Sequence, residues 1–84
     1  MEIEITPDAA QQIEDLPKGI HRRVMDVFDR LRRWPEVSGA KPMRYELKGS
    51  FRIRSGDWRV LFKVDLPRNL IVVFRVDNRR DVYE

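Results

Sequence analysis

The sequence predicts an α+β fold in which two helices pack on one face of a small, mostly antiparallel sheet. Two observations support this prediction. Apolar residues recur at three- and four-residue steps up to residue 34, as they do along amphipathic helices. From residue 45 onward the period changes to two, which is typical of strands. We therefore expect one domain, residues 1–84, with a short N-terminal strand, an antiparallel helical hairpin and a β-meander.

Length and composition exclude several classes of protein. The 84 residues are near the small end of the range for domains that fold unaided, and they contain no cysteine, which excludes disulfides and thiolate chemistry. The opening residues, MEIEITPD, do not resemble a signal peptide. The longest apolar run, residues 70–74, is far shorter than the ~20 residues of a membrane helix. We therefore expect a soluble, cytoplasmic protein.

The N-terminal half is expected to form a strand and two helices. Glu and Ile alternate over residues 2–5, which suits a strand. Thr6 suits the N-cap of the first helix and Pro7 its first turn, whereas Pro17 ends that helix. The second helix is expected to run over residues 18–34. Its apolar side comprises Ile20, Val24, Val27, Phe28, Leu31 and Trp34.

A tight hairpin is expected around Gly56-Asp57, because a type II′ turn requires glycine at its first central position. This turn joins strands at residues 51–55 and 58–65 and places Arg54 opposite Arg59. The face expected to pack under the helices carries Phe51, Ile53, Trp58, Val60 and Phe62. The opposite face carries Arg52, Arg54, Arg59, Leu61 and Lys63.

The third strand of the meander, residues 70–77, can join in two registers. One of them would bury Arg75 beside the helices, so we prefer the other. The preferred register directs Leu70, Val72, Phe74 and Val76 toward the core. It leaves Ile71, Val73, Arg75 and Asp77 on the face with the arginines.

The clustered arginines of the hairpin require an explanation. Arg54 directly opposite Arg59 is destabilising by roughly 0.2–1 kcal/mol, because like charges face each other across the strands. Two structural explanations remain open: Asp57, Asp65 or Glu46 pairs with the arginines, or the long arginine stems cover apolar surface. An anionic ligand is the simpler explanation, because this face is expected to lack an acid at its centre and guanidinium suits phosphate.

The distribution of charge points to the same part of the chain. Residues 1–50 contain nine basic and nine acidic residues, whereas residues 51–84 contain eight basic and five acidic residues. The net charge of +3 thus arises entirely in the C-terminal part. Modest basicity alone is a weak indication of a nucleic-acid partner, but its concentration in the expected sheet supports one.

The residues also restrict the chemistry of such a site. Arginine stays protonated at neutral pH and is therefore a poor proton acceptor. The single histidine, His21, is expected at the surface or at the end of the second helix. No cluster of histidine or carboxylate has the spacing of a metal site, so we expect neither a metal nor a cofactor. Arginines can instead stabilise negative charge on a reacting phosphate and orient RNA for in-line attack.

Two segments together resemble the RelE branch of the RelE/ParE toxins of bacterial type II toxin–antitoxin systems. These segments are FRIRSGDWRVLFKVD, residues 51–65, and IVVFRVDNRRDVYE, residues 71–84. ITPDAAQQIEDLP and KPMRYELKGS are similar to the family's opening strand and helix and to the segment that precedes its sheet. The resemblance therefore spans the whole chain and implies a RelE-like fold.

The resemblance implies a ribosome-dependent endoribonuclease that cuts mRNA in the A site by attack of a 2′-hydroxyl on the adjacent phosphate. The implied catalytic residues are Arg52, Arg54, Arg59, Arg79 and Tyr83, with Arg80 as an alternative to Arg79. RNA-binding roles are expected for Lys48, Lys63, Arg75 and Arg80. The implied partners are a cognate antitoxin, the ribosome and mRNA, with no membrane.

The chain also departs from the family pattern. Asn78 stands where many members have histidine, and arginines at positions 52 and 54 replace the lysines of RelE. Two other functions remain open. A gyrase-directed toxin of the ParE kind has the same fold, although such members generally lack the full set of basic residues and tyrosine. A catalytically silent RNA-binding module is the other alternative, since fold does not guarantee activity.

Overall fold

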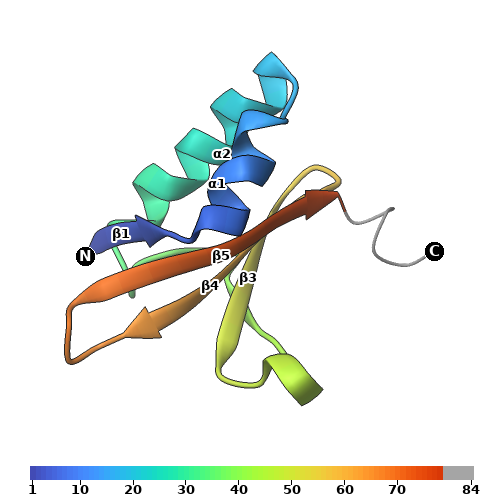
Figure 1. Cartoon of the computed structure of the whole chain (residues 1–84). Coiled ribbons are helices and arrows are strands. Elements are labelled where there is room, and N and C mark those ends of the chain that lie inside the picture. Colours follow the sequence, from blue (N-terminus) through green and yellow to red (C-terminus); the bar gives the residue numbers. More distant parts are fainter. Residues whose placement is uncertain (79–84) are drawn as a thin grey trace.

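The computed structural model describes residues 1–78, in which two helices cover one face of a five-stranded sheet (Figure 1). The helices are α1 (Pro7–Glu14) and α2 (Lys18–Leu31), and a short 3₁₀ helix is η1 (Tyr45–Leu47). The strands are β1 (Glu2–Ile5), β2 (Lys41–Pro42), β3 (Ser50–Ser55), β4 (Trp58–Asp65) and β5 (Leu70–Asn78). The predicted α+β architecture is confirmed. No helix in the described part of the chain has the length and apolarity that crossing a membrane requires.

The sheet is mixed, with the strand order β1-β5-β4-β3-β2. β1 runs parallel to β5, and the other neighbouring strands are antiparallel. The expected β-meander is therefore the β3-β4-β5 centre of the sheet. β1 extends it at one edge, and the two-residue β2, which lies in the expected loop, extends it at the other.

Helix α1 begins as the sequence predicts. The Thr6 hydroxyl accepts a hydrogen bond from the backbone N–H of Ala9 at 3.3 Å, and Pro7 occupies the first turn. The helix lies over β5 and buries Ala9 and Ile13 against the sheet. The cap thus fixes where the chain turns from β1 into the helical layer.

Helix α2 is shorter than expected, because it ends at Leu31 rather than at Trp34. The backbone N–H groups of Arg33 and Trp34 donate to the carbonyls of Arg30 and Leu31, three residues earlier, at 3.0 Å each. Such bonds tighten the end of a helix into a 3₁₀-like turn. Pro35 then follows without an N–H group to continue the pattern.

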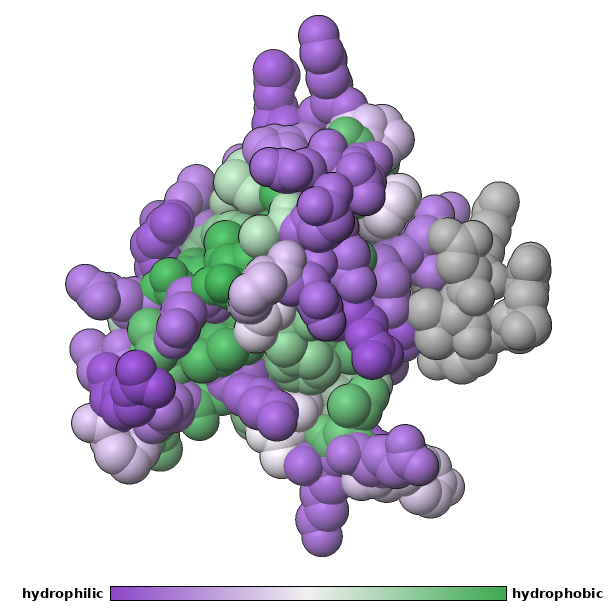
Figure 2. All heavy atoms as spheres, viewed as in Figure 1, coloured by the Kyte–Doolittle hydropathy of each residue, from purple (hydrophilic) through white to green (hydrophobic). Residues whose placement is uncertain are grey.

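One hydrophobic core fills the space between the helices and the sheet. It includes Val24, Val27, Phe28 and Leu31 from α2 and Ile53, Val60, Phe62, Ile71, Val73 and Val76 from the sheet. Trp34 packs edge-on against Phe51 and Phe62, with ring centroids 5.0 and 5.6 Å apart. Figure 2 shows hydrophilic residues over the helical hairpin, with hydrophobic residues reaching the surface on the side of β1, where Ile5 is 38% exposed.

The β3-β4 hairpin has the predicted register. Arg54 lies opposite Arg59, and Ile53 lies opposite Val60. Gly56 has a φ of +62°, which is the conformation that a II′ turn requires at its first central position. Of the residues expected under the helices, Ile53, Val60 and Phe62 are buried, and Phe51 and Trp58 are half-buried.

The register of β5 differs from the expected one because a β-bulge interrupts the pairing of β4 with β5. The register shifts between Leu61 and Phe62 of β4. Phe62 lies opposite Val73, whereas Leu61 lies opposite Arg75, so Phe74 is an extra residue in β5. The predicted face of the sheet is therefore correct for Arg75, Val76 and Asp77 only. Ile71 and Val73 belong to the core, and Leu70, Val72 and Phe74 do not.

The bulge has a clear physical reason. A shift of one residue exchanges the two faces of a strand. A single register along the whole of β5 would either bury the charge of Arg75 or turn Ile71 and Val73 away from the helices. The extra residue avoids both costs, because it lets each half of the strand direct its apolar residues toward the core.

Candidate functional site

Basic side chains line up on the face of the sheet that points away from the helices. Lys41 of β2 lies opposite Arg52 of β3, Arg52 lies opposite Leu61 of β4, and Leu61 lies opposite Arg75 of β5. Directly opposed residues share one face of a sheet. We call this surface the basic face, which carries Lys41, Arg52, Arg54, Arg59, Lys63 and Arg75.

Arg59 has a different environment from the other arginines of the basic face, because it is only 3% exposed. It lies opposite Asp77 of β5 and donates its Nε–H to Oδ1 at 3.0 Å and an Nη2–H to Oδ2 at 3.1 Å. The Asp77 side chain is 16% exposed. This bidentate ion pair holds the guanidinium in one orientation and offsets its charge.

The expectation that the basic face lacks an acid at its centre is therefore wrong. The bulge in β5 brings Asp77 into line with Arg59, which in turn lies opposite Arg54. The repulsion between the two arginines is compensated within the sheet. Clustered arginines alone are thus no sign of an empty phosphate site, and the case for a ligand must come from the accessible residues.

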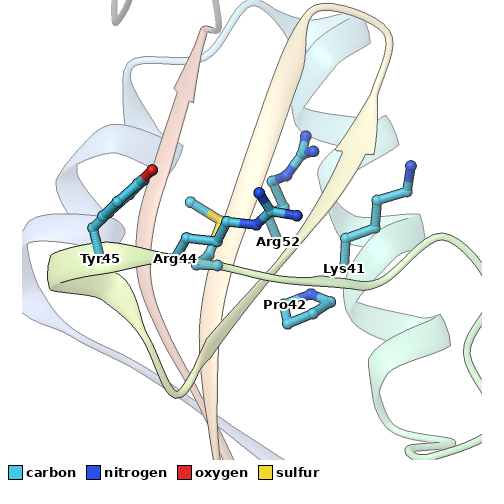
Figure 3. A pocket seen from close by; sticks show the side chains of 6 residues that line it. Lys41, Pro42, Arg44, Tyr45 and Arg52 are labelled. Carbon is cyan, nitrogen blue, oxygen red and sulfur yellow. The ribbon is translucent and has the colours of Figure 1, made fainter.

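Arg52 and Arg54 are accessible residues of the basic face, since Arg52 is half-buried and Arg54 is exposed. Two hollows meet at Lys41 and Arg52. The larger, about 550 Å³, is also lined by Pro42, Met43, Arg44 and Tyr45 (Figure 3). The smaller, about 210 Å³, is also lined by Gly39 and Arg54. Because they share two cationic residues, we treat the two hollows as one surface and call it the basic groove.

The groove contains three residues that sequence reasoning missed, namely Lys41, Arg44 and Tyr45. Tyr45 begins η1 and is 90% exposed. Figure 3 shows Tyr45, Arg44, Arg52 and Lys41 projecting to the same side of the β2-β3 region. The signal was present in KPMRYELK, residues 41–48, where basic residues flank a tyrosine within a loop.

The other expected RNA-binding residues occupy different places. Lys63 shares the basic face, and its Nζ lies 5.6 Å from the centroid of the Phe74 ring. Arg75 is exposed in the row of Leu61, and Lys48 is exposed where η1 ends. Arg79, Arg80 and Tyr83 lie outside the described residues.

The charged and aromatic side chains that line the basic groove are cations and one tyrosine. His21 is exposed on α2, in the helical layer that covers the other face of the sheet. Within residues 1–78, no three His, Cys, Asp or Glu side chains form a group that can hold a metal ion. The basic groove can therefore bind phosphate and orient it through guanidinium and ammonium groups.

Comparison with known proteins identifies the family. Residues 3–83 match the family model of the ParE toxin of the type II toxin–antitoxin system parDE. The chain belongs to the RelE/ParE family of toxins. The toxin is 37% identical to Toxin RelG of Mycobacterium tuberculosis over 82 residues. The alignment covers 96% of this chain and 93% of the relative. The toxin is 30% identical to Toxin RelE of the same organism, over 96% of this chain and 84% of the relative.

Solved structures share the fold of the toxin. A chain in the crystal structure of the toxin–antitoxin complex RelBE2 from M. tuberculosis is 33% identical and superposes with a TM-score of 0.82, over 93% of this chain and 96% of that chain. The isolated E. coli RelE toxin is 11% identical, with a TM-score of 0.78, over 92% and 82% of the two chains. The second likeness concerns the fold alone. The expected RelE-like fold is confirmed.

Proposed function

We propose that the toxin is a metal-independent endoribonuclease that cuts mRNA in the ribosomal A site. The observation that carries this proposal is the basic groove, where accessible Arg52 and Arg54 lie on one surface with the exposed Tyr45. Guanidinium groups suit phosphate, and an exposed aromatic ring suits an unstacked base of single-stranded RNA. The identity to relatives named RelG and RelE supports the same assignment.

In the proposed reaction, a 2′-hydroxyl of the mRNA attacks the adjacent phosphorus, and the bond from that phosphorus to the 5′-oxygen of the next nucleotide breaks. The net reaction moves one proton from the 2′-hydroxyl to the leaving 5′-oxygen. The products are a 2′,3′-cyclic phosphate and a free 5′-hydroxyl. Arg52 and Arg54 stabilise the negative charge that develops on the phosphate oxygens, an effect worth ~3–4 kcal/mol per well-placed donor in comparable oxyanion sites. The same contacts orient the strand for in-line attack.

Arg59 is a positioning residue in this proposal, because it is only 3% exposed and Asp77 binds two of its N–H donors. Arg79 and Tyr83 keep the catalytic roles that the family resemblance implies. Arginine is a poor proton acceptor, and the one histidine lies in the helical layer. The toxin therefore depends on the ribosome to position the mRNA, which explains a requirement for the A site.

A cognate antitoxin is the second partner that we propose. The related RelBE2 chain was crystallised as a toxin–antitoxin complex, and so was the intact E. coli RelBE pair. The toxin has the same fold as both. Co-expression with the protein encoded next to it, followed by purification through a tag on one chain, tests this pairing directly.

Mapping of mRNA 5′ ends tests the proposed activity. Toxin made by cell-free synthesis is incubated with purified ribosomes that carry a defined codon in the A site. We expect new 5′-hydroxyl ends within that codon, and no cleavage of the same mRNA without ribosomes. Intact mRNA on programmed ribosomes would refute the proposal.

Inhibition of DNA gyrase is a second candidate, because the matching family model is the ParE toxin. A supercoiling assay with purified gyrase separates the two functions. Loss of supercoiling at toxin concentrations that leave ribosome-bound mRNA intact would favour the ParE-like function. The reverse result would favour the endoribonuclease.

A further inference from the structure

Tyr45 combines a disfavoured backbone conformation with almost complete exposure. Its φ is +58°, in the left-handed region that glycine adopts freely and that residues with a Cβ atom rarely adopt. Among the other described non-glycine residues, Asn69 alone shares a positive φ, and asparagine tolerates this region well. Tyr45 is nevertheless 90% exposed, so burial of its ring does not offset the cost. Disfavoured conformations that persist without a packing reason point to a function.

The surroundings of the ring indicate what it meets. Lys41, Arg44 and Arg52 line the same hollow, together with Pro42 and Met43 (Figure 3). An exposed aromatic ring beside several cations is the arrangement with which proteins bind single-stranded nucleic acid, because bases stack on the ring while cations follow the phosphates. The positive charge of the hollow disfavours a basic or purely apolar partner.

The hollow with Tyr45 continues toward the arginines of the proposed catalytic site. Lys41 and Arg52 line this hollow and also the smaller one that contains Arg54. A strand whose base lies on Tyr45 therefore passes Arg44 and Arg52 before it reaches Arg54. One groove thus has room for a base at one end and for the reacting phosphate at the other.

We propose that Tyr45 is a stacking platform for one base of the single-stranded mRNA, and that Arg44 binds the phosphate beside that base. This inference rests on the proposed function for the identity of the RNA. The bound nucleotide is a neighbour of the scissile phosphate in the same strand. Tyr45 accordingly contributes to substrate affinity and to the choice of the neighbouring base, and it does not itself take part in the chemical step.

The test measures binding without the ribosome, so that it is independent of cleavage. A short fluorescent single-stranded RNA is titrated with wild-type toxin and with Tyr45→Phe, Tyr45→Ala and Tyr45→Gly variants, and anisotropy is recorded. We expect Tyr45→Phe to bind as wild type does. Tyr45→Ala and Tyr45→Gly should bind roughly 5- to 150-fold more weakly, which is the range of one lost base–aromatic stack. Leu66→Ala is the matched control, because Leu66 is 69% exposed in the β4-β5 turn, and it should bind as wild type does.

Thermal unfolding of the same variants separates function from folding. Tyr45→Gly should unfold at a temperature equal to or higher than that of wild type, because glycine adopts a φ of +58° without strain. A variant that is at least as stable but binds RNA more weakly would identify a residue retained for binding. If Tyr45→Gly has lost its thermal transition, the folded Tyr45→Ala variant decides. Weaker RNA binding by folded Tyr45→Ala would support the inference, and wild-type binding would count against it.

Several results would overturn the inference. One is unchanged RNA binding by Tyr45→Gly, and another is wild-type toxin that does not bind the RNA at all. If Tyr45→Gly weakens only the complex with the antitoxin, the ring is a protein contact and the inference is wrong. Failure of the proposed function has a different signature, since ribosome-bound mRNA then stays intact while RNA binding still depends on Tyr45.

Discussion

Replacing Asp77 with asparagine removes the negative charge that offsets Arg59. The two side chains share two hydrogen bonds of 3.0 and 3.1 Å, and Arg59 is buried. Asparagine retains an oxygen acceptor, but its amide group places N–H donors against the donors of the guanidinium. The change also leaves Arg59 and the opposing Arg54 as two adjacent positive charges without this carboxylate.

The expected loss of stability follows from the burial of the pair. Removing one partner of a buried ion pair typically costs about 3–5 kcal/mol, because a charge is left without compensation. Asp77 is not fully buried, since its side chain is 16% exposed, so we expect the lower end, about 3 kcal/mol. For a domain of this size, such a loss lowers the melting temperature by roughly 12–24 °C.

Chemical denaturation of purified toxin measures this effect as a change in the free energy of unfolding. Asp26→Asn is the control, because Asp26 is exposed on α2, and it should change the free energy of unfolding by less than about 0.5 kcal/mol. In the double variant Arg59→Met/Asp77→Leu, most of the stability should return, because apolar residues of similar volume need no compensation. An Asp77→Asn toxin as stable as the Asp26→Asn control would refute the assigned role of the ion pair.

Three further stability predictions concern the fold. Phe62→Ala should lower the free energy of unfolding by about 3–5 kcal/mol, because Phe62 is fully buried and its ring packs against Trp34 and Phe51; a loss below about 1 kcal/mol would contradict its central place in the core. Thr6→Ala should cost about 0.5–1 kcal/mol, since it removes the 3.3 Å N-cap bond of α1, and Thr6→Ser should restore most of it. Ser50→Ala should instead stabilise the toxin by about 1 kcal/mol, because the Ser50 Oγ is buried without a hydrogen-bond partner among the described residues. A less stable Ser50→Ala variant would contradict this reasoning.

The elements governed by local chemistry could be predicted from the sequence. Thr6 and Pro7 set the start of α1, and the Gly56-Asp57 turn set the register of the β3-β4 hairpin. In both cases the decisive residues are neighbours along the chain. The predicted end of α2 at Trp34 was wrong, because the apolar pattern that includes Trp34 continues beyond Leu31, where the helix ends.

The register of β5 could not be predicted, because both alternatives assumed one continuous register. The bulge at Phe74 depends on which residues in each half of β5 are buried against the core, and no local pattern along the strand reports this. Asp77 was placed on the correct face, but its pairing with Arg59 requires the extra residue. The ion pair at the centre of the basic face was missed for this reason.

The candidate site was predicted in part. The hairpin register placed Arg52 and Arg54 on a common face away from the helices, and the structure leaves both accessible. Tyr45 and Arg44 were missed, because their place beside Arg52 depends on the path of the loop that carries β2 and η1. In related sequences, a basic loop that contains a tyrosine and precedes an arginine-rich strand predicts a basic groove at this edge of the sheet.

The most direct test of the proposed function is the single-turnover rate at which ribosome-bound mRNA is cut by an Arg52→Ala toxin. Arg33→Ala is the matched control, because it removes the same charge from an exposed residue just after α2. We predict that Arg52→Ala cuts about 10²- to 10³-fold more slowly than wild type, as expected for one lost transition-state donor, and that Arg33→Ala cuts at the wild-type rate. Equal rates for the folded Arg52→Ala toxin and wild type would contradict the proposal that the basic groove is the catalytic site.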